Sequence, residues 1–129
     1  MTTPPNSMDQ LKLLSQMIDC MGEVIDPNMP WHQGQVFLAI ALAHPESIEM
    51  RDLGKLTGLS TSAISRNVAA LGEWHRLQRP GLGLVETRID LSDRRRRPIH
   101  LSKKGITAAN KLKEAMTEKL TAVLGKDKE

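Results

Sequence analysis

The sequence predicts a mainly α-helical (α+β) domain that contains one two-stranded β-hairpin. Three observations support this prediction. Apolar residues recur at helical spacing over several long stretches. Hydrophobic residues make up 40% of the chain and aromatic residues only 2%, so the core must consist of Leu, Ile, Val, Met and Ala, a composition that suits packed helices. Two short segments that alternate apolar and polar residues flank a run of four arginines, as strands flank the tip of a hairpin.

Length and charge narrow the class of protein. A chain of 129 residues fits a single domain spanning 1–129. No apolar run approaches the roughly 20 residues of a membrane span, and the first residues lack the features of a signal peptide. Cys20 is the single cysteine, which excludes an internal disulfide and fits a reducing cytoplasm. The net charge is +3, and residues 86–105 hold seven basic against three acidic residues, hence +4. Such focused positive charge indicates a phosphate-binding surface.

The first two predicted helices occupy residues 7–25 and 31–43. One face of the first helix is lined by apolar residues at spacings of three and four: Leu11, Leu14, Ile18, Met21 and Ile25. Pro27 and Pro30 separate the two helices. The second helix is apolar over much of its surface, so we expect it at the centre of the core, and residues 44–47 end it.

Residues 48–71 predict two short helices joined by a tight turn. Leu53 and Leu56 share a face of the first helix, and Gly58 supplies the backbone freedom with which that helix stops. Ser60 is a good N-cap for the second helix. The second helix directs Ile64, Val68 and Leu71 one way and Ser62, Ser65, Arg66 and Ala69 the other. This pattern is typical of a helix-turn-helix, although any αα-hairpin can look similar.

A hairpin and a long helix complete the chain. Residues 72–83 are a loop with three glycines and one proline, and the two predicted strands, 84–89 and 98–102, flank a tip that carries Arg94–Arg97. Ser102 is expected to cap a final helix over 103–124, with an apolar stripe along one side and Gly125 as its stop. A helix-turn-helix followed at once by a basic hairpin is the plan of a winged helix-turn-helix, in which the hairpin is the wing.

Residues 83–105 resemble the wing of the MarR family of bacterial regulators. The residues that match its pattern in order and spacing are Gly83, Leu84, Val85, Asp93, Arg95, Leu101, Ser102 and Gly105. Residues 52–71 are similar to the helix-turn-helix of the family, and residues 34–47 to the helix before it. The resemblance covers residues 31–105 well and both terminal helices loosely.

The resemblance implies a sequence-specific regulator of transcription, in the usual case a repressor. As a homodimer it would bind a pseudo-palindromic site on double-stranded DNA in the cytoplasm, at the nucleoid, and be encoded by a bacterium, phage or plasmid. It assigns residues 31–105 to DNA binding and the flanking helices, 7–25 and 103–124, to dimerisation. The expected DNA-binding residues are Ser60, Thr61, Ser62, Ser65 and Arg66 in the major groove and Arg94, Arg95, Arg96 and Arg97 in the minor groove. Asp93 would orient a neighbouring wing arginine.

Two departures from the family pattern stand out. The family passes from the recognition helix to its Gly-Leu-Val segment in a few residues, whereas here Leu71 and Gly83 are separated by eleven, 72–82. This insertion would either move the wing or contact a partner. The chain also has one helix after the wing where the family usually has two, so the usual dimer would be reduced or rearranged.

Other interpretations of the same residues stay open. The arginine run could be a solvated hairpin tip. Cys20 fits ordinary packing better than peroxide sensing, because Asp19 and Glu23 disfavour a thiolate. Trp74–His75 would be a loop anchor or a contact surface. The function could instead be replication or plasmid maintenance on DNA, or a protein-interaction module that uses residues 72–83.

The sequence offers no catalytic constellation, so we expect no enzyme and no cofactor. Four histidines and one cysteine without metal-ligand spacing predict no metal site. The scarcity of aromatic residues disfavours a stacking pocket, and the sequence names no small-molecule or protein effector.

Overall fold

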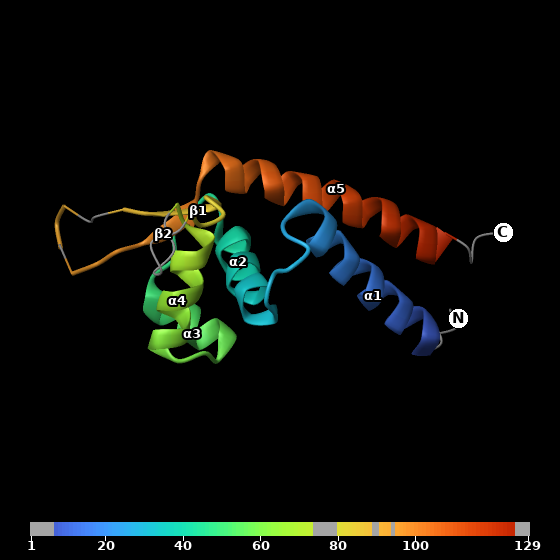
Figure 1. Ribbon diagram of the computed structural model, residues 1–129, viewed down its shortest axis with the longest axis horizontal. Coiled ribbons are helices and arrows are strands. Elements are labelled where there is room, and N and C mark those ends of the chain that lie inside the picture. The colour runs from blue at the N-terminus through green and yellow to red at the C-terminus, as the bar shows by residue number, and fades with distance from the viewer. Residues whose placement is uncertain (1–6, 74–79, 89–90, 94, 126–129) are drawn as a thin grey trace. The chain divides into compact units, whose positions relative to one another are not determined.

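The computed structural model describes residues 7–73, 80–88, 91–93 and 95–125. These residues form α1 (Ser7–Val24), α2 (Trp31–Ala43), α3 (Met50–Thr57), α4 (Thr61–Leu71), β1 (Val85–Thr87), β2 (Ile99–Leu101) and α5 (Lys103–Gly125) (Figure 1). Five helices and one antiparallel two-stranded sheet confirm the mainly α prediction. The chain divides into two compact units, Pro30–Ala109 and Met1–Met29 with Asn110–Glu129, so that α5 belongs to both.

The core of the unit Pro30–Ala109 is built around α2, which contacts α3, α4 and β2. Side chains from all four elements are fully or almost fully buried: Val36, Phe37, Ile40, Leu53, Ile64, Leu71 and Ile99. The predicted central place of α2 is therefore confirmed. Its surface is not buried all round, because Trp31 and Leu42 are 70% and 86% exposed.

The turn between α3 and α4 has the predicted caps. Gly58 adopts the left-handed conformation (φ 74°) and donates its N–H to the carbonyl of Gly54 at 2.8 Å. A side chain with a Cβ would be strained at that φ. The Ser60 Oγ accepts the N–H of Ala63 at 3.2 Å and so satisfies one of the free donors at the start of α4.

Leu53 and Leu56 lie on neighbouring lines of α3, as their spacing predicts, but only one of them reaches the core. Leu53 is fully buried, whereas Leu56 is 67% exposed. Three residues advance an α-helix by about 300°, which places Leu56 about 60° around the axis from Leu53. In a helix of eight residues, only the line through Leu53 reaches the core.

The two strands pair antiparallel, with Val85 opposite Leu101, Glu86 opposite His100 and Thr87 opposite Ile99. Each has three residues, fewer than predicted. The sheet is extended by Ile48, which exchanges two backbone hydrogen bonds of 2.8 Å with Ile99. Ile48 thus pairs with β2, and α3 begins two residues later than the predicted start of the segment. This contact ties the base of the hairpin to the chain that enters α3.

Ser102 holds the junction between the hairpin and α5. Its Oγ accepts the N–H of Gly105 at 3.0 Å, which confirms the predicted cap, and donates to the carbonyl of Gly83 at 2.6 Å. Gly83 has a positive φ of 71°. A Cβ on Gly105 would collide with the carbonyl oxygen of Leu84. Both glycines and the serine are therefore required by local geometry.

The insertion after α4 begins and ends at the same place. The N–H of Gly81 donates to the carbonyl of Glu73 at 2.9 Å, and Gly83 and Leu84 donate to Gly72 and Leu71 at 2.8 and 2.7 Å. The chain therefore returns to the C-terminal end of α4 before β1 starts. Trp74 and His75, for which an anchor or a contact surface was expected, lie outside the described residues.

The other unit consists of α1 and the part of α5 that follows Ala109. Cys20 is fully buried in α1, as ordinary packing requires. Large apolar side chains are nevertheless exposed on these helices: Met8, Leu11, Leu14, Ile18 and Leu120. Among the described helices, none combines the length and the apolar character needed to cross a membrane.

Candidate nucleic-acid interface

The outer face of α4 is polar and accessible. Ile64, Val68 and Leu71 are buried, which fixes the rotation of the helix about its own axis. The opposite side presents exposed Thr61, Ser62, Ser65 and Arg66. Small hydroxyl side chains let a helix backbone approach a nucleic acid closely, and an arginine can bond to base edges. Within the described residues Arg66 forms no ion pair, so no bond must break before it can bind.

Ser60 lies at the edge of this face with its hydroxyl already engaged. It caps α4 through Ala63 and lies 3.5 Å from the Oγ of Ser62. Its first task in the structure is therefore to position the start of α4.

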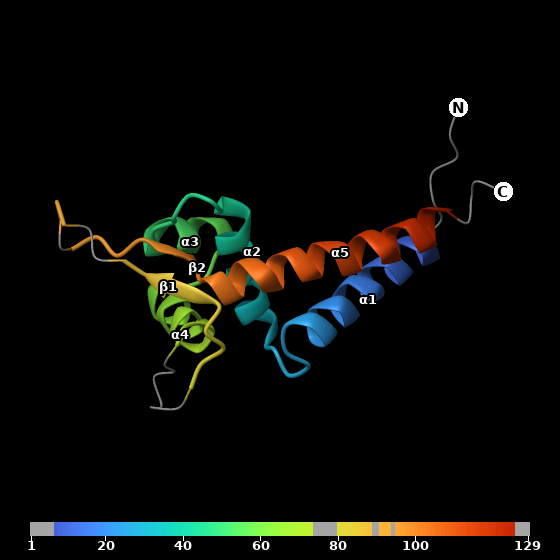
Figure 2. The same ribbon diagram turned by 90° about the horizontal axis from the view of Figure 1, so that it is seen from above.

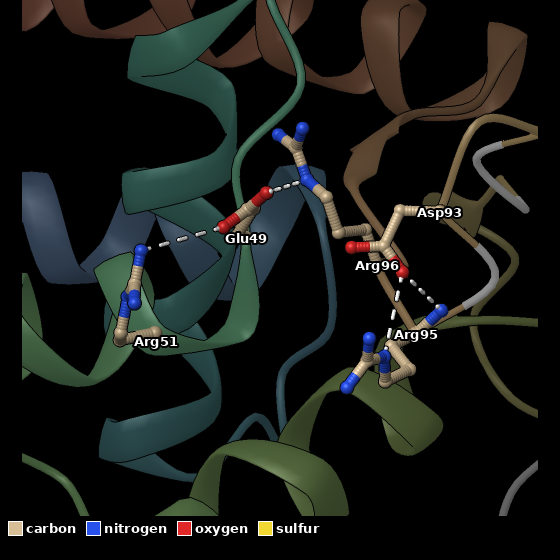
Figure 3. A network of polar contacts seen from close by, with 5 residues as sticks. All are labelled: Glu49, Arg51, Asp93, Arg95 and Arg96. Carbon is tan, nitrogen blue, oxygen red and sulfur yellow. Dashed lines mark hydrogen bonds and ion pairs between the residues drawn. The ribbon is translucent and has the colours of Figure 1, made fainter.

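Asp93 shapes the tip of the wing. Its Oδ1 accepts the backbone N–H of Arg95 at 3.0 Å, and its carbonyl accepts the N–H of Arg96 at 3.0 Å. The same carboxylate oxygen lies 3.7 Å from Arg95 Nε (Figure 3). This turn presents the Arg95 side chain, which is 96% exposed, on the outside of the tip.

The arginines of the wing have different surroundings. Arg94 lies outside the described residues. Arg95 pairs loosely with Asp93, and the Nε of Arg96 donates to the Oε1 of Glu49 (Figure 3). Arg97 is exposed and forms no ion pair within the described residues.

Glu49 and Arg51 join this surface although no pattern in the sequence indicated them. Glu49 is the residue before α3, and its Oε2 lies 3.9 Å from Arg51 Nη2. Glu49 and Arg96 are 47 residues apart, so spacing along the chain carries no signal of their contact.

An open hollow lies between the wing and the start of α3, and it is lined by Glu49, Met50, Arg51, Asp93, Arg95, Arg96 and Arg97. Four arginines against two carboxylates give the hollow a net charge of +2. The wing itself extends beyond α3 and α4 in both views (Figure 1 and Figure 2).

In the part of the chain that the structure describes, no group of His, Cys, Asp and Glu side chains could hold a metal ion. The arginines of this surface can offer guanidinium groups to the phosphates of a nucleic acid.

The comparison with solved structures identifies the fold. The chain superposes on RV1404 from Mycobacterium tuberculosis with a TM-score of 0.73 and 19% identity, covering 97% of this chain and 84% of that one. It superposes on a point mutant of MepR from S. aureus bound to an oligodeoxyribonucleotide with a TM-score of 0.71 and 14% identity, covering 92% and 78%. For the transcriptional repressor CouR bound to a 23-mer DNA duplex the TM-score is 0.63 and the identity 21%, covering 94% and 79%.

Comparison of the amino-acid sequence itself gives no match. No protein-family model and no curated protein matches this chain. The element order α1–α4, β1–β2, α5 and the superpositions nevertheless agree with the resemblance seen in residues 31–105. The chain has the winged helix-turn-helix fold of MarR-type transcriptional regulators.

Proposed function

We propose that this protein is a sequence-specific regulator of transcription that binds double-stranded DNA. The observation that carries the proposal is the combination, in one compact unit, of an exposed polar face on α4 and a wing that bears arginines. Two proteins with this fold, MepR and CouR, are bound to DNA in their solved structures, and CouR is a transcriptional repressor. The mechanism that we propose is repression by occlusion of a promoter.

Each contact has a proposed role. Thr61, Ser62, Ser65 and Arg66 enter the major groove from α4, whose rotation is fixed by its buried face. The arginines at 94–97 follow the DNA backbone toward the minor groove, where guanidinium groups bind phosphates and suit a narrow groove. Asp93 orients Arg95 through the turn at the tip. Ser60 acts mainly by capping α4.

We further propose that the protein binds DNA as a homodimer. The exposed apolar residues of α1, together with Leu120 of α5, form a surface that a monomer leaves in water. A two-fold dimer built on residues 7–25 and 103–124 would present two copies of the winged helix, 31–105, to half-sites about one helical turn apart. A pseudo-palindromic site follows from that symmetry.

Selection of bound fragments from bacterial genomic DNA, followed by footprinting, tests the proposal. The expected result is a pseudo-palindromic sequence that overlaps promoters, bound with an affinity that falls steeply with salt. Sites confined to a replication origin would show replication or plasmid maintenance instead. An absence of salt-dependent binding to any duplex would refute DNA binding and favour a protein-interaction module.

A further inference from the structure

The carboxylate of Glu49 bridges two arginines from different parts of the winged helix (Figure 3). One oxygen accepts a hydrogen bond from the Nε–H of Arg96 in the wing, and the other lies 3.9 Å from Arg51 Nη2 of α3. The Glu49 side chain is 24% exposed, whereas those of Arg96 and Arg51 are 55% and 75% exposed. The acid is thus largely enclosed between two cations that face solvent.

The backbone fixes the position of this carboxylate. Ile48, the residue before Glu49, is held to Ile99 of β2 by two hydrogen bonds of 2.8 Å. Glu49 occupies the N-cap position of α3 but makes no side-chain capping bond. Its side chain is therefore committed to the two arginines, and it links the wing to the first helix of the helix-turn-helix.

The link places a negative charge where phosphates are expected. A phosphate that approaches the hollow between the wing and the start of α3 meets Arg96 and Arg51 already paired with Glu49. To bind either arginine it must share or displace the carboxylate. Backbone contacts supply nearly all of the affinity for non-specific DNA, so this competition weakens non-specific binding most.

The specific complex responds differently. There the base contacts proposed for α4 select one site on the duplex, so each wing meets phosphates at fixed positions. Holding Arg96 in one place limits the freedom that is lost on binding in that register. On a random duplex the phosphates take varied positions relative to the wing, and an arginine held by Glu49 follows them less well.

We propose that Glu49 is a specificity-determining residue, which lowers affinity for non-specific DNA by holding Arg96 and Arg51 in ion pairs. This inference rests on the proposed function, because it assigns Glu49 a role at the same DNA-binding surface. Glu49 itself contacts no bases in this proposal, and it acts on DNA binding through the arginines that it holds.

The test is Glu49→Gln, which keeps the size of the side chain and removes its charge. Binding of the dimer to the selected duplex and to a scrambled duplex of equal length is measured by fluorescence anisotropy over a range of salt concentrations. We expect affinity for the scrambled duplex to rise roughly threefold to tenfold, with a salt slope steeper by about 1.8 units, because one arginine is released in each protomer of the dimer. Affinity for the selected duplex should change less, so that the specificity ratio falls.

Two further variants separate pairing from net charge. Glu46→Gln removes the same charge from an exposed side chain three residues earlier and should leave the specificity ratio unchanged. In an Arg96→Gln background, the effect of Glu49→Gln should shrink, since the main partner is already gone. Circular dichroism melting confirms that each variant is folded.

The outcomes are distinguishable. If wild-type protein binds neither duplex, the proposed function fails, and the inference fails with it. If wild-type protein binds but Glu49→Gln leaves the specificity ratio unchanged, only the inference fails. An effect of equal size in the Arg96→Gln background would also overturn it, because Glu49 would then not act through the wing arginine that it holds.

Discussion

Replacing Arg66 or Arg97 with alanine separates the contribution of α4 to DNA binding from that of the wing. Both changes remove one positive charge from an exposed side chain that forms no ion pair within the described residues. Neither substitution therefore leaves an unpaired carboxylate behind, and the two variants are matched controls for each other. Arg66 lies on the polar face of α4, and Arg97 at the wing.

The expected cost of losing Arg66 is a loss of base recognition. An arginine that bonds to guanine O6 and N7 contributes about 1–3 kcal/mol of discrimination, which corresponds to roughly a 5- to 160-fold change in dissociation constant for each half-site. Base preference should relax at one position of each half-site. The salt slope should change little, because a base contact releases no phosphate counterion.

The expected cost of losing Arg97 is independent of sequence. A dimer loses two phosphate contacts, so the negative slope of log K against log salt should become shallower by about 1.8 units. Between about 50 and 200 mM salt, a fourfold change, the deficit of the variant should shrink by roughly 12-fold. The selected sequence should be unchanged.

The assay is sequence selection with each variant, followed by anisotropy titrations on selected and scrambled duplexes at several salt concentrations. The reasoning is refuted if Arg66→Ala selects the wild-type sequence while Arg97→Ala relaxes a base position. It is also refuted if the slopes of the two variants are equal, since the structure then gives the wrong division of contacts.

Two other predictions concern stability and assembly. Ser102→Ala should lower the free energy of unfolding by about 2 kcal/mol, because the hydroxyl both caps α5 and bonds to the carbonyl of Gly83. Thr107→Ala, which removes an exposed hydroxyl from the same helix, should cost less than about 0.5 kcal/mol in urea unfolding at equal protomer concentration, and equal costs would contradict the role of Ser102. Leu14→Glu should raise the dissociation constant of the dimer at least roughly tenfold in sedimentation, because it would place a charge in the apolar interface. Ser15→Glu introduces the same charge at an exposed polar position beside it and should leave the dimer intact; a dimer equally stable in both variants would exclude this surface.

The sequence by itself determined which elements form and how the turn between α3 and α4 is capped, because these features depend on short-range geometry. Apolar residues at spacings of three and four set the inner face of α4. Ser60 caps α4 through its hydroxyl, and Gly58 ends α3 because a residue without a Cβ adopts the left-handed conformation freely. The same holds for the wing motif. The backbone at position 83 has a positive φ, and at position 105 a carbonyl approaches too closely to leave room for a Cβ. Both positions therefore need glycine, and these two glycines belong to the wing pattern that the sequence shows.

Only the tertiary structure decided which of these elements touch. Ile48 pairs with β2, and Glu49 binds Arg96, although each pair is far apart along the chain. The insertion after α4 closes on itself through Glu73 and Gly81, so it does not lengthen the path to β1. Such contacts depend on where the core places two segments in space, and no periodicity along the chain encodes that placement. A run of arginines predicts a phosphate-binding surface, but it does not reveal which arginine is already held by a carboxylate.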